Sequence, residues 1–169
     1  MRGSRRMRFV GAAALTLVVV LAALLTPARP ALADDSLTLP AGLACSFELK
    51  VDIVCGTQVY KEFFDKNGNL VRSLSAGKGS ALTFTNTETG ATLSIHPNGS
   101  VWHVTYNPDG SETWVITGHN VLILFPSDVP AGPSTTQYVG RGVYTGDTVG
   151  VFTIQKVSGT STDICAALS

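Results

Sequence analysis

Turn signals recur about every ten residues from Phe47 onward, and they separate short runs rich in valine, threonine, isoleucine and aromatic residues. No stretch sustains the 3.6-residue apolar spacing of an amphipathic helix, so the pattern predicts an all-β chain. Short loops between consecutive strands predict an antiparallel meander. About ten strands are expected, and they lie at residues 45-55, 58-64, 69-75, 80-86, 91-96, 100-106, 111-117, 120-125, 137-145 and 149-157.

The hairpin turns predict which residues lie side by side. The sequence Asn-Pro-Asp-Gly at 107-110 suits a type I turn followed by a left-handed glycine, which pairs Val104 with Trp114. The same three-residue loop at 66-68 pairs Glu62 with Arg72, two residues of opposite charge.

Three further turns extend this register into one continuous sheet. A four-residue loop at 87-90 pairs Phe84 with Leu93. Tight turns at 98-99 and 118-119 continue the register, so that five strands share a common apolar face. The opposite face is rich in threonine and is expected to meet solvent. The apolar face is the expected core, and its members are Leu82, Phe84, Leu93, Ile95, Trp102, Val104, Trp114, Ile116, Val121 and Ile123.

Two glycines near residue 140 indicate how the sheet closes. Gly140 and Gly142 are expected opposite Ile154 and Phe152, across a three-residue hairpin loop at 146-148. Glycines beneath large side chains mark a sharply curved strand. The expected fold is therefore a closed or nearly closed β-barrel, with a β-sandwich as the alternative.

The first 33 residues have the order of a secretory signal peptide. The basic opening MRGSRRMR precedes an apolar run of 17 residues from Phe9 to Leu25, and Ala31-Leu32-Ala33 forms a small-residue cleavage box. We expect cleavage after Ala33 and a secreted, extracellular protein without a membrane span; an uncleaved anchor is the alternative. The expected domains are the signal peptide at 1-33, a lead-in at 34-44 and a single β domain at 45-169.

Three cysteines in an oxidising compartment predict one disulfide and one remaining thiol. Cys45 and Cys55 flank one strand, and ten extended residues span about 33 Å, so only one of the two pairs with Cys165. Cys55 continues an apolar alternation and is expected to be buried, which favours a monomer and leaves Cys45 as the expected partner of Cys165. Cys55 as a catalytic nucleophile is the alternative reading.

The distribution of charge argues against a nucleic-acid partner. Five of the twelve basic residues lie in the signal peptide and all twelve acidic residues follow it, so the mature chain has seven bases against twelve acids. These seven bases are scattered along the sequence. No basic stripe for nucleic acid is therefore expected.

Groups that could carry catalysis or bind a metal are sparse. The expected register places Ser94 opposite His103, with His96 on the same face, so a hydrolase using Ser94 and His103 is one hypothesis. No third group is placed to orient the imidazole, and the two histidines lack a third metal ligand. The single acids Asp65, Asp109 and Asp147 are interpreted as turn residues rather than calcium ligands. We expect no metal and no cofactor, name no catalytic residue, and leave enzyme activity open.

Aromatic residues on the core face form the candidate ligand site. A barrel of about ten strands is wide enough that side chains need not fill its interior. Packing of the aromatic rings in the core is the alternative reading. The candidate ligand-binding residues are Trp102, Tyr106, Trp114, Tyr138 and Tyr144.

Four segments carry a resemblance to known proteins: AGLACSFEL at 41-49, DKNGNLVRSLSAGKGSALTF at 65-84, GHNVLILFPSDVPAGPSTTQYVGR at 118-141 and DICAALS at 163-169. Through them the chain resembles uncharacterised small secreted proteins of actinomycete bacteria. The resemblance implies a Gram-positive source and export, and it brings no activity, ligand or catalytic residue with it. It also favours the pairing of Cys45 with Cys165, because the segments around both cysteines carry the resemblance.

Three functions follow from these observations. The first is a secreted, non-enzymatic β-barrel that binds a small apolar ligand or a cell-envelope component. The second is an adhesion or inhibitory module that binds a protein through the proline-rich loop at 126-136. The third is the hydrolase that uses Ser94 and His103.

Overall fold

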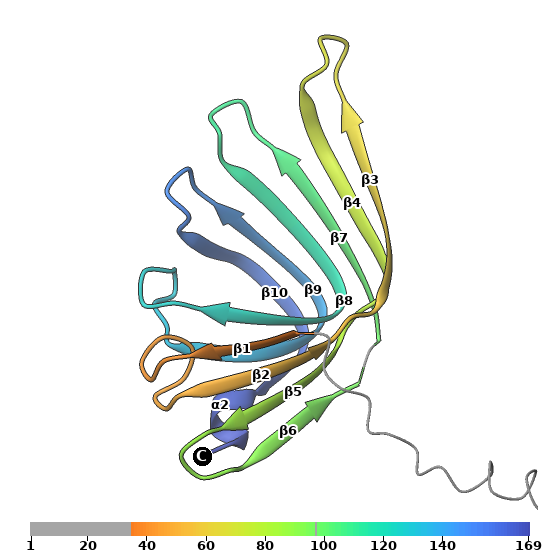
Figure 1. The fold of residues 1–169 in the computed structure, drawn as a ribbon. Coiled ribbons are helices and arrows are strands. Elements are labelled where there is room, and N and C mark those ends of the chain that lie inside the picture. Colours follow the sequence, from red (N-terminus) through yellow and green to blue (C-terminus); the bar gives the residue numbers. More distant parts are fainter. Residues whose placement is uncertain (1–34, 97) are drawn as a thin grey trace, which may run out of the picture. The chain divides into compact units, whose positions relative to one another are not determined.

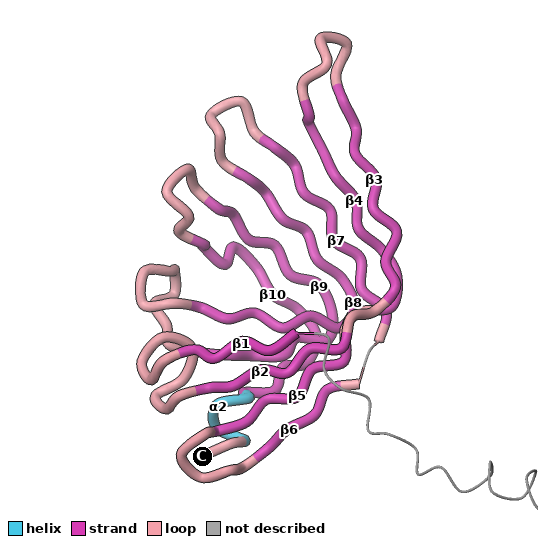
Figure 2. The backbone as a smooth tube through the Cα atoms, in the orientation of Figure 1, coloured by secondary structure: helices cyan, strands magenta, loops and turns pink. Residues whose placement is uncertain are grey.

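The computed structural model describes residues 35-96 and 98-169. The predicted signal peptide at 1-33 and the cleavage site after Ala33 lie outside these residues. The described chain contains ten antiparallel strands and one short helix, so the all-β prediction is confirmed (Figures 1 and 2). Within residues 35-96 and 98-169, no helix has the length and apolar content that crossing a membrane requires.

The strands form two sheets. The four-stranded sheet has the order β1-β2-β5-β6, and the six-stranded sheet has the order β10-β9-β8-β7-β4-β3. The elements are β1 (Asp35–Leu39), β2 (Leu49–Val54), β3 (Thr57–Phe64), β4 (Leu70–Lys78), β5 (Ala81–Asn86), β6 (Thr92–Ile95), β7 (Gly99–Tyr106), β8 (Glu112–Leu124), β9 (Ser134–Gly146), β10 (Phe152–Asp163) and α2 (Ile164–Ala167).

The predicted closed barrel is wrong, because the described strands form two separate sheets in a sandwich-like arrangement, which was the alternative. The chain passes from one sheet to the other between β2 and β3, between β4 and β5, and between β6 and β7. Each passage is a short link rather than a hairpin, so the expected tight turn at 98-99 does not pair its flanking strands. Strands that switch sheets in this way build the corners of sandwiches.

A row of glycines crosses the six-stranded sheet at the level of this corner. In the register, Gly77 of β4 neighbours Ser100 of β7, which neighbours Gly118 of β8, Gly140 of β9 and then Gly159 of β10. All four glycines have positive φ angles, between 89° at Gly118 and 151° at Gly140. We call these five positions the glycine row.

The glycine row brings backbones closer together than side chains allow. A Cβ atom on Gly140 would lie 2.1 Å from the carbonyl oxygen of Ser158, and one on Gly118 would lie 2.3 Å from that of Gly99. Real Cβ atoms do not approach other atoms this closely, so only glycine fits. The row divides β8 into two halves that pack in different places: Trp114 lies in an aromatic cluster, and Ile123 packs against the core of the four-stranded sheet.

The predicted register is confirmed within two hairpins. Val104 pairs with Trp114, and Phe84 pairs with Leu93. Both turns have the loop length that their sequences demand, and loop length sets hairpin register.

The other register predictions are wrong for local reasons. An irregularity between Phe63 and Phe64 shifts the first hairpin, so Arg72 pairs with Phe63 instead of Glu62. Its guanidinium lies over the Phe63 ring, 4.4 Å from the ring centre. β8 continues as one bent strand through the expected turn at 118-119. The last hairpin has its three-residue loop at 148-150, two residues later than expected. An irregularity between Ile154 and Lys156 then shifts the rest of the strand, so Gly142 pairs with Val157 and Gly140 with Gly159.

The main core lies against the four-stranded sheet. Leu49 and Phe84, on its central strands β2 and β5, are fully buried. Val121 and Ile123 of β8 and the two buried residues near the C-terminus, Ile164 and Leu168, pack on the same cluster. Strand β1 extends this sheet by pairing with β2, and it arises within the segment 34-44 that the sequence pattern left as a lead-in.

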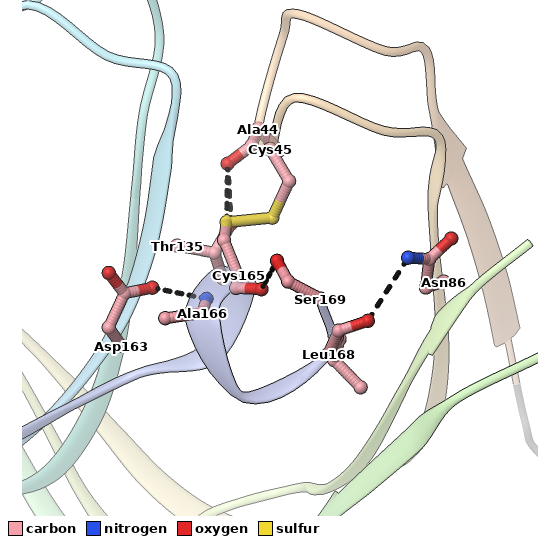
Figure 3. Close-up of a disulfide and its surroundings, with 9 residues drawn as sticks. All are labelled: Ala44, Cys45, Asn86, Thr135, Asp163, Cys165, Ala166, Leu168 and Ser169. Atoms are coloured by element: carbon pink, nitrogen blue, oxygen red, sulfur yellow. Dashed lines mark hydrogen bonds between the residues drawn. A yellow bond between two sulfur atoms is a disulfide. The ribbon is translucent and has the colours of Figure 1, made fainter. Parts of the chain in front are cut away.

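The predicted disulfide between Cys45 and Cys165 is present and holds the C-terminal segment on the core (Figure 3). A sequence separation of 120 residues makes this a long loop, and in the chain-entropy model such a bond contributes about 4–5 kcal/mol. Buried Thr135 of β9 supports it by donating a 3.0 Å hydrogen bond to the carbonyl of Ala44.

The expected burial of Cys55 is wrong. Cys55 is exposed and lies outside the disulfide. It follows the last residue of β2 at the link where the chain leaves one sheet for the other. The apolar alternation of β2 therefore ends before Cys55, and its side chain is not directed by the pleat of that strand.

We expect Gly118→Ala to lower the free energy of unfolding by at least about 2 kcal/mol, because an alanine at a strongly positive φ is strained and its Cβ would meet the Gly99 carbonyl. Gly99→Ala is the matched control, since a Cβ there meets nothing within 4 Å. Urea denaturation measures both variants. Equal stability of the two would show that the glycine row is not required.

We expect Asn86→Ala to lower the free energy of unfolding by about 1–3 kcal/mol, because it removes a buried amide with several partners. Asn86 donates a 3.1 Å hydrogen bond to the carbonyl of Leu168 (Figure 3). It also accepts one of 3.0 Å from the amide of Glu88. Exposed Asn98, whose side-chain amide donates to the His96 carbonyl, provides the control Asn98→Ala. Thermal denaturation with the disulfide intact makes the comparison, and equal loss in both variants would contradict the assignment.

Candidate functional site

Three of the five predicted ligand-binding residues lie together on one face of the six-stranded sheet. Trp102 is on β7, Trp114 on β8 and Tyr144 on β9. The rings of Trp114 and Tyr144 are stacked, with centroids 5.7 Å apart and planes at 14°, as their direct pairing across the two strands requires. Trp102 meets Trp114 edge-on at 5.8 Å. We call this side of the sheet the aromatic face.

The other two predicted residues lie away from this cluster. Tyr106 is on the aromatic face near the end of β7, and its hydroxyl lies 3.3 Å from Oγ of buried Ser73. Tyr138 lies beyond the glycine row on β9, where it pairs with Asn120 and Ser161. Neither tyrosine lines the cavity described below.

Phe152 completes the cluster and was missed as a site residue. Its ring meets Tyr144 edge-on at 5.8 Å and Trp114 at 6.4 Å. The signal in the sequence is the glycine at 146. It lies opposite Phe152 at the start of β10 and has no side chain to displace the ring. The expected register placed Phe152 opposite Gly142, so the contact with Tyr144 was not foreseen.

The indole N–H groups of both tryptophans are satisfied within the protein. Nε1 of Trp102 donates to Oδ1 of Asn120 at 2.5 Å, and Nε1 of Trp114 donates to Oε2 of Glu112 at 2.9 Å. Burying an indole without such a partner costs free energy. With their donors occupied, the two indoles offer only apolar surface to anything that lies against them.

A cavity of about 170 Å³ lies beside the aromatic cluster. It is bounded by the cluster on one side and by the second half of β8 on the other, because β8 folds back beyond the glycine row. The lining contains no formally charged side chain. Its residues are Trp102, Trp114, Val121, Leu122, Ile123, Leu124, Tyr144, Phe152 and Ile154. We call this space the aromatic cavity.

The loop at 126-136 is held beside the aromatic cavity by a buried carboxylate. Asp128 accepts hydrogen bonds from the backbone amides of Phe125 at 2.7 Å and Phe152 at 2.9 Å. Val129 then forms an isolated bridge with Thr153 of β10. The loop is therefore fixed to the strand that carries Phe152. Its role as a protein-binding surface stays a prediction.

A larger space of about 630 Å³ opens at the corner between the two sheets. It shares Trp102 and Val121 with the aromatic cavity, so the two spaces adjoin. Its lining is more polar and includes His96, His119 and Gln137. The aromatic cavity thus has a larger and more polar neighbour.

The structure separates the residues of the proposed hydrolase. Ser94 lies on β6 of the four-stranded sheet, where it pairs with Thr83, and its hydroxyl lies 3.1 Å from that of Thr83. His103 lies on β7 of the six-stranded sheet, between Leu74 and Val115. The expected pairing of Ser94 with His103 is wrong because β6 and β7 join at a corner instead of a hairpin. Across residues 35-96 and 98-169, no cluster of three or more metal-ligating side chains is found.

The acids in the turns bind their own backbone. Asp65 accepts hydrogen bonds from the amides of Asn67 and Asn69, and Asp147 does the same with Val149 and Val151. Hydrogen bonds from the side chain and backbone of Asn69 lower the pKa of Asp65. These carboxylates stabilise turns, as is usual for aspartate at such positions.

Comparisons with known proteins provide no relative. No protein-family model, curated protein or solved structure matches the chain. The candidate site is therefore interpreted from its own geometry.

Burial raises the pKa of Tyr144 to about 12, so the folded protein keeps a phenolic proton that the unfolded chain releases above pH 10. The folded state then binds more protons, and stability falls as pH rises from 10 to 12. We expect Tyr144→Phe to reduce this alkaline loss by about 2–3 kcal/mol at most. Urea denaturation at pH 8, 10 and 11.5 measures it, and parallel curves for the two proteins would contradict the assignment.

Proposed function

We propose that the protein binds a small apolar ligand in the aromatic cavity and that it acts outside the cell. The observation that carries this proposal is an unfilled space beside four packed aromatic rings whose tryptophan donors are already satisfied. Cores are normally packed without voids larger than a water molecule. A space left open among rigid rings, without charged groups, is suited to an apolar guest.

The volume sets the size of the ligand. A space of about 150 Å³ accommodates benzene, and the aromatic cavity, which is partly open to solvent, is close to this size at about 170 Å³. One aromatic ring or a short branched alkyl group fits such a space. A larger ligand would insert one apolar end here and extend into the corner space that shares Trp102.

Action outside the cell is proposed from the first 33 residues and from the disulfide. The signal-peptide pattern predicts export, and a bond between Cys45 and Cys165 persists in an oxidising compartment. The resemblance to secreted actinomycete proteins supports the same location. A cell-envelope component with an apolar end is a ligand that the protein would meet there.

Toluene is the probe that tests the proposed cavity. We expect it to raise the melting temperature of the wild-type protein and to show magnetisation transfer from the protein in NMR. Ile154→Phe places an additional ring in the cavity lining and is expected to weaken binding at least tenfold, because the space is then occupied.

The matched control is Val157→Phe, a change of the same kind on the same strand at an exposed position. It is expected to bind toluene as the wild type does. Absence of toluene binding in the wild type would overturn the proposed function. Equal binding by Ile154→Phe and Val157→Phe would place the apolar site elsewhere.

A further inference from the structure

The face of the six-stranded sheet opposite the aromatic face carries most of the basic residues of the mature chain. One register row crosses all six strands there, from Lys61 on β3 through His103 on β7 to Lys156 on β10. Arg72 pairs with Phe63, and Arg141 pairs with Thr117. Phe63 and Thr117 are each two residues from a member of the row, so both arginines lie on the same face as the row, on opposite sides of it. We call this side the basic face.

All five of these side chains are exposed. Lys61, Arg72, Arg141 and Lys156 are four of the seven bases that follow the predicted signal peptide. No acidic residue of the six strands shares the basic face: Glu62 and Glu112 occupy the alternate positions, and Asp163 caps α2. The basic face therefore has a net positive charge in a chain whose mature part has more acids than bases.

The cations of the basic face are not neutralised by acidic neighbours. The ion pair found among the described residues is that of Lys50 with Asp52, on the four-stranded sheet. Arg72 contacts the ring of Phe63, an interaction that leaves its charge unpaired by any carboxylate. Unpaired cations on a common face raise the local positive potential and attract anions.

The fold assembles a stripe that the sequence order conceals. The four bases lie between positions 61 and 156 of the sequence, and β3, β4, β9 and β10 each carry one of them. Neighbouring strands lie about 4.8 Å apart, so six strands give a stripe roughly 24 Å long that runs across them. Bases that are scattered along the sequence therefore lie on one face of the folded sheet.

We propose that the basic face docks a linear anionic polymer that carries repeated phosphate groups. A stripe of separated cations across strands matches charges repeated along a flexible chain. Threonines, partly buried aliphatic residues and the exposed imidazole of His103 lie between the cations, and Arg72 lies over the Phe63 ring. The tryptophans and tyrosines of the six strands occupy the alternate positions, so none of them offers nucleic-acid bases a stacking surface on this face. This surface lies on the opposite side of the sheet from the aromatic cavity, so the two sites are independent.

Long-chain inorganic polyphosphate is the probe that tests the proposal. At 20 mM salt, the mature protein is expected to bind it, with an affinity that falls steeply as salt increases. Arg141→Gln/Lys156→Gln removes two cations from the basic face and is expected to weaken binding at least fivefold and to reduce the salt slope. Arg72 is left unchanged in this variant because it also packs on Phe63.

Lys50→Gln/Lys66→Gln is the matched control, because it removes the same net charge away from the basic face. It is expected to bind polyphosphate within twofold of the wild type. Equal weakening by both double variants would overturn the proposal, since only net charge would then matter. Absence of polyphosphate binding together with binding to vesicles that contain one third anionic phospholipid would also overturn it, in favour of a membrane surface.

Discussion

The close approach of backbones along the glycine row is the constraint on which the rest of the structure depends. Gly140 and Gly159 each lie where a Cβ would be 2.1 Å from a carbonyl oxygen of the neighbouring strand. Because β8 and β9 fold back at this level, the second half of β8 and the first half of β9, which pair with each other, lie toward the core of the four-stranded sheet, while Trp114 and Tyr144 remain in the aromatic face. The glycine row thus separates the core from the aromatic cavity along the same strands.

The C-terminal segment, which the disulfide and Asn86 hold in place, completes the core of the four-stranded sheet. Ile164 and Leu168 are fully buried on the core, and they are held there by the disulfide and by the hydrogen bond from Asn86. A core built from a four-stranded sheet and a few residues of β8 is small, so covalent closure of the chain matters for stability. This disulfide does not reach the aromatic face. The rigidity of that face comes from ring packing and from Asp128, which ties the loop at 126-136 to β10.

The parts of the fold that depend on local sequence could be predicted, and the parts that depend on long-range assembly could not. The turn at 107-110 and the alternation around Val104 and Trp114 determine one hairpin, and its register is confirmed. The same alternation places Trp102 beside Trp114. Whether β6 and β7 form a hairpin or a corner depends on packing between the two sheets. The alternation of apolar and polar residues along a strand does not predict that packing.

Two errors at the candidate sites have the same origin. Ser94 and His103 were expected to meet only because β6 was taken as the neighbour of β7. The basic face was missed because its cations become neighbours through the pairing of β3, β4, β9 and β10 across the whole sheet. The glycine row was foreseen only in part, through the curvature expected at Gly140, since its alignment with Gly118 requires the register of three strands.

The proposed function depends most on a space that side chains leave open beside Trp114 and Tyr144. Crystals of the mature protein under xenon pressure test this claim most directly, because xenon enters apolar cavities of this size. We expect a xenon atom between these rings and the second half of β8, near Leu124. A crystal in which side chains fill this volume, with no xenon beside Trp114, would contradict it.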